Sequence, residues 1–240
     1  MSEHPEFVET PPTTVEVDYT PGPVLKTEGP WTPLLWDMDG TLLDSAVAIV
    51  RRLRETLLHF GVTPPSDDQL KFLIGPPTGT SLLRFIGTAR IDESRAYYRS
   101  LSERDGLKDQ QLFPWILSTL KTLHEAGIPM GVATSKPQHE AERLCDAYGM
   151  TPYFTAIVGG NEERKDKASV IAEVLRQLGN DNALMIGDRF YDTDGAALNG
   201  IPTVLVRWGY AHEKEFAGAM ATVSNETELL ELLLGSGEVA

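Results

Sequence analysis

The sequence predicts an α/β protein with a doubly wound, Rossmann-like parallel sheet and an inserted helical cap. From Phe113 onward, short apolar runs alternate with helical segments, which is typical of parallel strands joined by crossover helices. The first apolar run, Leu34–Trp36, is separated from the next, at residues 130–133, by a mainly helical stretch far longer than one crossover needs. Two carboxylates directly follow the first run, at the edge where such sheets bind their ligands.

Length and charge exclude several kinds of protein. The chain of 240 residues has an ordinary globular composition, no apolar run long enough to cross a membrane, and no signal-peptide pattern at its N-terminus. We therefore expect a cytoplasmic protein without a membrane partner. The net charge of −14 argues against a nucleic-acid polymer as partner, because backbone phosphates need clustered Lys and Arg. A small anionic substrate is compatible with this charge, since a metal ion and one lysine can reverse the local field.

Residues 1–30 predict a disordered acidic tail. They combine several prolines with acidic residues and threonines, and they have few large apolar side chains. Such a segment cannot bury enough surface to offset the entropy that it loses on ordering. The alternative is a tail that docks on a partner or folds over an active site.

We expect two domains after the tail. Residues 31–46 and 113–240 form the α/β core domain, and residues 47–112 form the helical cap domain inserted into it. Leu34–Trp36 is the first core strand, since a short apolar run is typical of a buried parallel strand. The apolar runs that predict the remaining strands are residues 130–133, 156–158, 183–186 and 203–206.

The cap begins with an amphipathic helix. Asp44 and Ser45 are its candidate N-caps, and Gly61 is its candidate end. A second helical stretch is interrupted by a turn at Gly75 and Pro76, where glycine and proline break the periodic pattern.

Asp37 and Asp39 would lie together at the carboxyl edge of the sheet. Two acids in one site can divide the chemistry, because one can attack an electrophile while the other exchanges a proton with the leaving group. Gly40 allows a sharp turn beneath them, and Thr41 offers a hydroxyl and an amide to a phosphoryl oxygen. The alternative is that Asp-x-Asp-Gly is an ordinary turn.

Two further segments supply polar groups suited to a phosphoryl ligand. Thr134, Ser135 and Lys136 follow the second core strand, where hydroxyls and free amides can hold a phosphoryl oxygen; a helix N-cap is the alternative. Lys167 begins an amphipathic helix and could supply the cation that paired carboxylates and a dianionic phosphoryl group require. Lys165 is its nearest competitor, and a solvated charged face is the alternative for both.

Asp188 and Asp192 follow the strand at residues 183–186. Carboxylates at this strand end would face Asp37 and Asp39 and complete a hard, oxygen-rich site suited to Mg²⁺. The alternative for Asp192 is a helix N-cap.

From about Trp31 to the C-terminus, these motifs resemble the haloacid dehalogenase superfamily of phosphohydrolases, whose first motif is Asp-x-Asp-x-Thr. The resemblance implies an Mg²⁺-dependent phosphomonoester hydrolase. Asp37 would attack phosphorus and form an aspartyl phosphate, and Asp39 would protonate the leaving oxygen and then activate water. Lys167 would hold the nucleophile and offset charge in the transition state.

The resemblance also assigns ligands and substrate contacts. The metal ligands would be Asp37, the backbone carbonyl of Asp39, Asp188 and, through a shorter or water-mediated contact, Asp192. The cap turn would reach down as a specificity loop, or it is only a turn between cap helices. The expected substrate- and phosphate-binding residues are Thr41, Gly75, Pro76, Thr134, Ser135 and Lys136.

Within the superfamily, the chain is similar to the branch of phosphoglycolate phosphatases and 5′-nucleotidase-like enzymes. The similar segments are residues 74–77, 132–137, 185–189 and 206–210. The resemblance implies a small phosphorylated metabolite, either phosphoglycolate or a 5′-nucleotide, as substrate. A phosphotransferase or sugar-phosphate mutase that uses the same aspartyl phosphate is the alternative. The sequence leaves the oligomeric state open.

Several residues bear on substrate choice. Lys71 and Arg84 of the cap would meet an anionic substrate tail or be solvated. Trp115 stands where the family usually has a glycine, so the start of the following core helix differs. Glu162 and Glu163 add negative charge near the expected substrate entrance.

Overall fold

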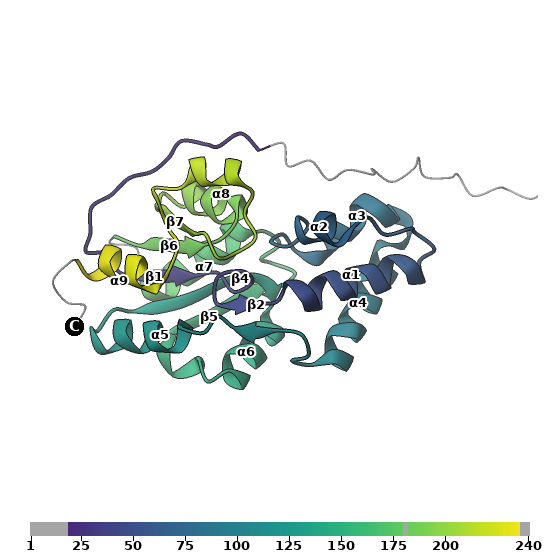
Figure 1. The fold of residues 1–240 in the computed structure, drawn as a ribbon, viewed down its shortest axis with the longest axis horizontal. Helices are drawn as coiled ribbons and strands as arrows, with labels where there is room; N and C mark the ends of the chain where they lie inside the picture. The colour runs from purple at the N-terminus through teal and green to yellow at the C-terminus, as the bar shows by residue number, and fades with distance from the viewer. Residues whose placement is uncertain (1–18, 180–181, 236–240) are drawn as a thin grey trace, which may run out of the picture.

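The computed structural model describes residues 19–179 and 182–235, and a six-stranded parallel sheet forms its centre. The strands are β1 (Leu34–Trp36), β4 (Met130–Pro137), β5 (Ala156–Gly160), β6 (Leu184–Gly187), β7 (Thr203–Val206) and β8 (Ala221–Val223). Their order across the sheet is β5-β4-β1-β6-β7-β8. This arrangement confirms the α/β fold that the sequence predicts (Figure 1).

Helices cover both faces of the sheet. The core helices are α5 (Ile116–Glu125), α6 (Gln138–Ala147), α7 (Lys167–Leu178), α8 (Phe190–Leu198) and α9 (Glu226–Leu234). Because side chains alternate along a strand, Leu34 and Trp36 pack with α5, α6 and α9 on one face. Leu35 packs with α7 and α8 on the other face. The two apolar clusters therefore sandwich the sheet.

Strand β1 lies at the point where the strand order reverses. It pairs in parallel with β4 on one side and with β6 on the other. The chain continues outward from β4 to β5, and separately from β6 through β7 to β8. Doubly wound sheets bind ligands at the carboxyl ends of the strands at such a reversal. The residues that follow β1, β4 and β6 therefore surround the expected site.

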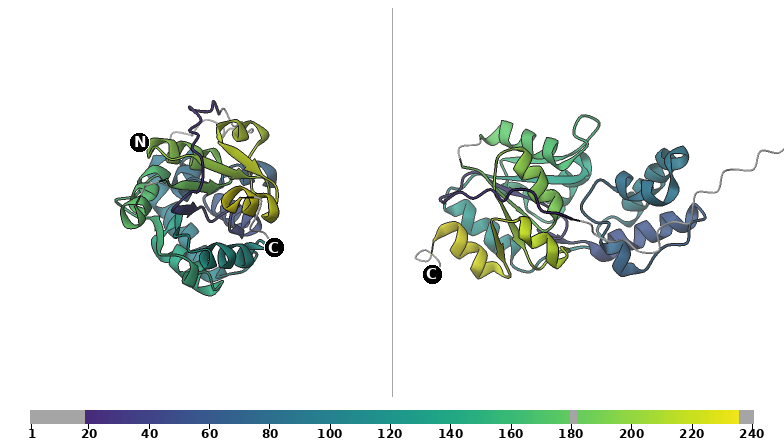
Figure 2. Two further views of the ribbon diagram at one scale, coloured as in Figure 1. Left: turned by 90° about the vertical axis from the view of Figure 1, so that its left-hand side faces the viewer. Right: turned by 90° about the horizontal axis from the view of Figure 1, so that it is seen from above.

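A helical module with its own apolar cluster is inserted after β1. Its helices are α1 (Ala46–His59), α2 (Asp67–Lys71), α3 (Thr78–Ile86), η1 (Thr88–Arg90) and α4 (Ile91–Asp105). Leu57, Leu70 and Leu82 are among the buried members of that cluster. The chain passes from the sheet into the module through β2 (Leu43–Asp44) and returns through β3 (Gln111–Leu112), and these two strands form a short antiparallel pair. The module stands beside the sheet and its helices (Figure 2).

The structure differs from the prediction for the start of α1. Ser45 occupies the N-cap position, but its side chain forms no hydrogen bond with the amides of the first helical turn. The Ser45 hydroxyl donates instead to Asp39. The hydroxyl of Tyr210, which follows β7, accepts from the amides of Ser45 and Ala46 at 2.8 and 3.0 Å. A core residue therefore replaces the expected local cap.

Strand boundaries also differ in places. Strand β4 extends beyond its predicted apolar run into the polar residues that follow, and β5 extends into Gly159 and Gly160. Strand β8 was not expected, because its run Ala221–Val223 is too short to show a pattern. The remaining short helices are η2 (Thr151–Tyr153) and η3 (Glu213–Gly218). Within the described ranges, every helix is too short or too polar to cross a membrane.

Residues 19–30 form no helix or strand, but they contact the core. The ring of Tyr19 lies 4.7 Å from that of Phe190 between centroids, and its hydroxyl is 3.2 Å from Thr193 Oγ1. Asn182 donates to the carbonyls of Glu28 and Pro30. This part of the predicted tail is thus attached to the core, which is a difference from a free tail. Residues 1–18 lie outside the described residues.

Candidate active site

Three carboxylates meet at the carboxyl edge of the sheet. Asp37 directly follows β1, Asp188 directly follows β6, and Asp192 lies in the first turn of α8. Each is buried, and one carboxylate oxygen from each lies within 4.8 Å of the others. Strand pairing explains the meeting, because β1 and β6 are neighbours that end together.

The loop after β1 passes very close to Asp188, and only glycine permits this. Gly40 has a φ of +83°, which is a left-handed conformation that other residues rarely adopt. A Cβ at this position would lie 2.1 Å from Asp188 Oδ2. Gly40 therefore allows the loop that carries Asp39 and Thr41 to close over the carboxylates.

Lys167 supplies the cation of this cluster. Its Nζ lies 2.5 Å from Asp37 Oδ1 and 2.8 Å from Asp192 Oδ1, and it donates to the carbonyl of Ala133 at 2.7 Å. The first turn of α7 places it there, while Lys165 is exposed in the preceding loop. Of the two lysines weighed from the sequence, Lys167 is the one that contacts Asp37.

The cluster carries more negative charge than Lys167 can balance. Burial raises the pKa of Asp37 to about 7; Lys167 opposes this shift, whereas Asp192 adds to it. Burial, together with Asp37 and Asp192, raises the pKa of Asp188 well above its usual range. Burial lowers the pKa of Lys167, but the charges of Asp192 and Asp37 outweigh it and raise that pKa. A divalent cation would relieve the remaining repulsion.

The hydrogen bonds show which carboxylate oxygens are free. Asp192 Oδ2 accepts from the amides of Asp188 and Arg189, both at 3.0 Å, while its Oδ1 faces Lys167. Asp192 thus accepts hydrogen bonds from amides at the start of α8 and also contacts Lys167 in the acidic cluster. Asp188 Oδ2 accepts from the Tyr210 amide at 2.7 Å, but its Oδ1 is buried without a partner. This orphaned oxygen and the neighbouring carboxylates fit a hard divalent metal.

The expected phosphate-binding hydroxyls lie beside these acids. Thr41 Oγ1 and Ser135 Oγ are buried and have no hydrogen-bond partner among the described residues. Thr134 Oγ1 accepts from the amide of Lys136 at 3.2 Å and keeps its own proton to donate. Buried hydroxyls without partners are costly, so their presence favours a polar ligand at this place.

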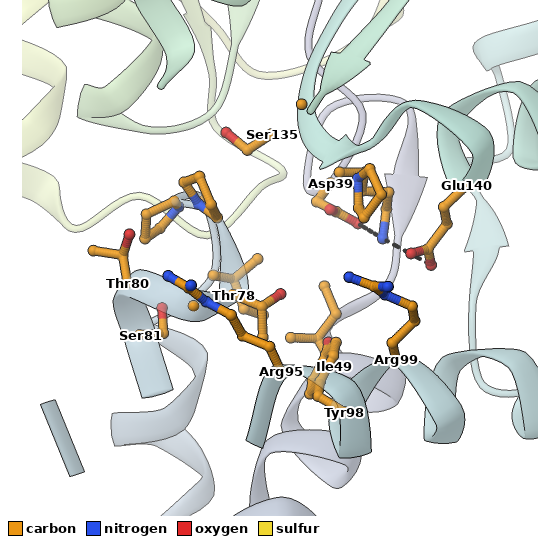
Figure 3. Close-up of a pocket in the computed structure, with 18 of the residues that line it drawn as sticks. Asp39, Ile49, Thr78, Thr80, Ser81, Arg95, Tyr98, Arg99, Ser135 and Glu140 are labelled. Atoms are coloured by element: carbon orange, nitrogen blue, oxygen red, sulfur yellow. Dashed lines mark ion pairs between the residues drawn. The ribbon is translucent and has the colours of Figure 1, made fainter. Parts of the chain in front are cut away.

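Asp39, unlike Asp37, lines a pocket between the core and the helical module. The pocket has a volume of about 620 Å³. Lys136 Nζ lies 3.2 Å from Asp39 Oδ1 and 3.8 Å from Glu140 Oε1 (Figure 3). The Ser45 hydroxyl also donates to Asp39. The two acids of the first motif therefore face different spaces, Asp37 toward the acidic cluster and Asp39 toward the pocket.

A buried arginine of the core holds the turn of the helical module that lines this pocket. Gly75 and Pro76 are on the pocket wall. Just before them, the carbonyls of Phe72 and Ile74 accept hydrogen bonds from the Arg189 guanidinium, the first at 3.3 Å. The same guanidinium forms a bidentate ion pair with Glu215, with bonds of 2.9 and 3.1 Å.

Sequence reasoning missed several of these residues. Arg189 stood inside a recognised motif, but its partner Glu215 is far along the chain and carries no pattern of its own. The pocket is lined by Arg95 and Arg99 of α4, whereas Lys71 and Arg84 do not line it. Helical spacing could have placed Arg95 and Arg99 on one face, since they are four positions apart.

Trp115, which departs from the family pattern, is partly buried and packs against the core. Its ring makes an edge contact with Trp208, with centroids 5.6 Å apart. The Trp208 indole donates to the carbonyl of Thr41 at 3.1 Å. The aromatic pair therefore supports the loop that follows β1.

The fold and the site together define a class of protein: a doubly wound α/β protein with a buried acidic cluster at its strand reversal and a helical module beside it. The chain belongs to the haloacid dehalogenase-like hydrolase family, whose family model matches residues 34–206. This match confirms the family that the sequence motifs indicated.

Curated relatives carry different names. The tyrosine-protein kinase PtkA of Mycobacterium tuberculosis is 37% identical over 182 residues, which are 74% of this chain but only 62% of PtkA. A 5′-nucleotidase of Pseudomonas aeruginosa is 33% identical over 79% of this chain and 88% of its own length. A phosphoglycolate phosphatase of Rhodobacter capsulatus is 32% identical over 74% of this chain and 84% of its own length.

A solved structure supports the same relationship. A haloacid dehalogenase-like family hydrolase from Streptococcus pneumoniae superposes with a TM-score of 0.77 at 28% sequence identity. The match covers 84% of this chain and 97% of that chain. The helical module and the sheet are thus both part of the shared architecture.

Proposed function

We propose that this protein is an Mg²⁺-dependent phosphomonoester hydrolase that acts through an aspartyl phosphate. The observation that carries this proposal is the placement of Asp37. Its carboxylate contacts Lys167 and lies beside the orphaned Asp188 Oδ1, at the strand reversal. Asp37, the Asp39 carbonyl, Asp188 and, less directly, Asp192 would hold the metal. When bound, Mg²⁺ would neutralise charge on the phosphoryl group and orient it.

In the first step, a carboxylate oxygen of Asp37 attacks phosphorus, and the bond from phosphorus to the leaving oxygen breaks. Lys167 keeps Asp37 in place and offsets charge as the phosphoryl group is transferred. The hydroxyls of Thr41 and Ser135, which lack partners, would donate to the phosphoryl oxygens. Thr134 and the amides at the start of α6 would add to these contacts.

Asp39 would carry the proton in both steps. It gives a proton to the leaving oxygen in the first step, and it takes one from the water that then attacks the aspartyl phosphate. Release of inorganic phosphate restores the Asp37 carboxylate. The position of Asp39 on the pocket wall, beside Lys136, suits this proton-transfer role, because the leaving group must occupy the pocket.

We propose a small phosphorylated metabolite as substrate and a cytoplasmic location. Relatives named 5′-nucleotidase and phosphoglycolate phosphatase support a small phosphomonoester. The helical module, residues 47–112, would act as a cap that encloses the leaving group, with Gly75 and Pro76 on its specificity loop. Exclusion of water by such a cap would strengthen the electrostatic contacts in the site.

A second candidate is phosphoryl transfer to an acceptor other than water. The relatives named tyrosine-protein kinase PtkA favour it, since they are 37% identical to this chain. Transfer would use the same aspartyl phosphate on Asp37. It would differ only in the acceptor that reaches the intermediate.

Phosphate release measured with Mg²⁺ and with EDTA, over a panel of phosphomonoesters, tests this proposal. We expect metal-dependent release and, after acid quenching, a phosphorylated peptide that contains Asp37. Release that continues in EDTA, or a phosphoryl group on another residue, would contradict the mechanism. A labelled Asp37 that loses its phosphoryl group to an added acceptor faster than to water would favour the second candidate.

A further inference from the structure

We propose that the pocket binds a second anionic group of the substrate, through Arg95 and Arg99 of α4. The substrate class is then a phosphomonoester whose leaving group is larger than glycolate and carries a carboxylate or a second phosphate. This inference rests on the proposed phosphohydrolase function, because the reacting phosphoryl group must lie at Asp37.

The pocket has a charge opposite to that of the whole chain. Five cationic side chains and three anionic ones line it, although the net charge of the chain is −14. The cationic residues are Arg95, Arg99, Lys136, Arg164 and Lys165. A positive pocket in an acidic protein attracts small anions and repels cations.

Not all of these cations are available to a ligand. Lys136 is engaged by Asp39 and Glu140 and would remain near the reacting group. Arg164 is held by neutral acceptors, the carbonyl of Gly159 and the amide oxygen of Gln138, both at 3.1 Å, so its charge is not offset.

The cap arginines and Lys165 are the least committed of the five cations. Lys165, which lies in the loop before α7, forms no hydrogen bond or ion pair among the described residues. Arg99 has no hydrogen bond or ion pair within the part of the chain that the structure describes. Arg95 has only an exposed pair with Asp92 at 3.3 Å, which is a weak kind of interaction. Both guanidinium groups are therefore free to bind an anion.

The Arg95 side chain packs against α3 of the helical module and stays about half exposed. Gly79, which is buried in α3, lies against the Arg95 guanidinium, and a Cβ there would be 2.1 Å from Arg95 Nε. Glycine inside a helix is unfavourable, so its presence at this contact has a cost that close packing explains. Arg95 and Arg99 project from the same face of α4 into the space opposite Asp39 and Ser135 (Figure 3).

The size of the pocket agrees with a leaving group longer than two carbons. A volume of about 620 Å³ is in the range of sites that enclose whole small metabolites. A substrate that places its phosphoryl group at Asp37 and its second anion at the α4 arginines would span the pocket. A neutral nucleoside would pair with neither arginine, so it would lack the charge-assisted hydrogen bonds that a second anion can form there.

The test compares substrates that differ only in the distal charge. Sorbitol 6-phosphate and 6-phosphogluconate share a carbon chain but end in a hydroxymethyl group and a carboxylate, respectively. We expect kcat/KM to be at least about tenfold higher for 6-phosphogluconate, and higher than for 2-phosphoglycolate. Fructose 1,6-bisphosphate, compared with fructose 6-phosphate, tests a phosphate as the second anion in place of a carboxylate.

Variants test which residues cause the preference for the substrate with a distal anion. Arg95→Gln with Arg99→Gln should bring the ratio for the sorbitol and gluconate pair close to one, and Gly79→Ala should lower it less, by displacing Arg95. Arg84→Gln, which removes a cap arginine that does not line the pocket, should keep the wild-type ratio. An equal ratio for wild type and the double variant would overturn the proposal, as would a preference for the neutral or the two-carbon compound.

A binding measurement separates this inference from the hydrolase proposal. With Asp37→Asn, calorimetry in Mg²⁺ should show tighter binding of 6-phosphogluconate than of sorbitol 6-phosphate, and the two arginine substitutions should remove the difference. Absence of turnover by wild type would contradict the hydrolase function, and equal binding of the two compounds would contradict the anion subsite.

Discussion

Two buried charged clusters lie side by side at the start of α8, and they differ in balance. Arg189 and Glu215 are both almost inaccessible, and their charges cancel. Glu215 accepts two bonds from the guanidinium and further bonds from the amides of Phe190 and His212. In the second cluster, Lys167 contacts two of the three carboxylates, Asp37 and Asp192, while Oδ1 of the third, Asp188, has no partner.

This difference in charge balance distinguishes a structural ion pair from a candidate ligand-binding site. A buried pair whose hydrogen bonds are complete holds the helical module to the core and has no capacity left for a ligand. A buried cluster with excess charge and an unpaired oxygen is unstable unless something binds there. Residual charge and orphaned atoms, rather than burial alone, therefore mark the functional cluster in this protein.

The largest expected effect comes from Asp37→Asn. Without the nucleophile, turnover should fall by roughly four orders of magnitude or more. Stability of the metal-free protein at pH 8 should rise, because one repelling buried charge is removed. Phosphate release and urea unfolding measure the two quantities. A stability loss comparable to that of a core cavity would show that the cluster is structural.

The next effect comes from Glu215→Ala. It leaves Arg189 buried without its carboxylate, so the free energy of unfolding should fall by about 3–5 kcal/mol. Arg189→Met combined with Glu215→Leu should recover much of that loss. The solvent-accessible pair of Arg176 with Glu173 is the control, and Glu173→Ala should lower the free energy of unfolding far less. Equal losses at the buried and solvent-accessible pairs would contradict the comparison.

Metal binding should act on the unbalanced cluster alone. Mg²⁺ at about 100 times its Kd should stabilise the folded protein by about 2.7 kcal/mol, measured by thermal unfolding. Asp188→Asn should abolish this increment, since Asp188 holds the orphaned oxygen. Glu215→Gln should keep it. A metal increment that survives Asp188→Asn would place the ion elsewhere.

The last effect is a pH dependence of the metal-free protein. Folding raises the pKa of Asp37 from 3.8 to about 7, so the folded state binds more protons than the unfolded chain between these values. The contribution of Asp37 to stability should therefore be fully present below about pH 4 and be lost as the pH rises toward 7, and Asp188 shifts in the same direction. Asp37→Asn should flatten this decline in unfolding curves; an unchanged slope would assign it to other groups.

The sequence was sufficient for the fold class and the family because both depend on local patterns. The apolar runs fix the sheet, and strand ends necessarily bring Asp37 and Asp188 to one edge. The structure also brings Lys167 and Asp192 to that edge. Their catalytic and metal-binding roles stay predictions, as does the division into domains.

Contacts between distant segments could not be predicted. Glu215 meets Arg189 only because η3 folds back over α8, and no local spacing signals that pairing. Tyr210 satisfies the start of α1 from another part of the chain, so the local cap rule was wrong there. Charge runs also gave no way to rank Arg95 and Arg99 above Lys71 and Arg84, because pocket lining depends on how α4 packs.

Tyr210 links Asp188 of the acidic cluster to the start of α1 in the helical module. Its amide donates to Asp188, and its hydroxyl accepts from the first amides of α1. A shift of either partner changes the bond to the other, so the position of α1 and the orientation of Asp188 are thermodynamically linked. Such linkage is reciprocal: a ligand that draws the helical module inward would alter metal affinity, and metal binding would alter closure by the same free energy.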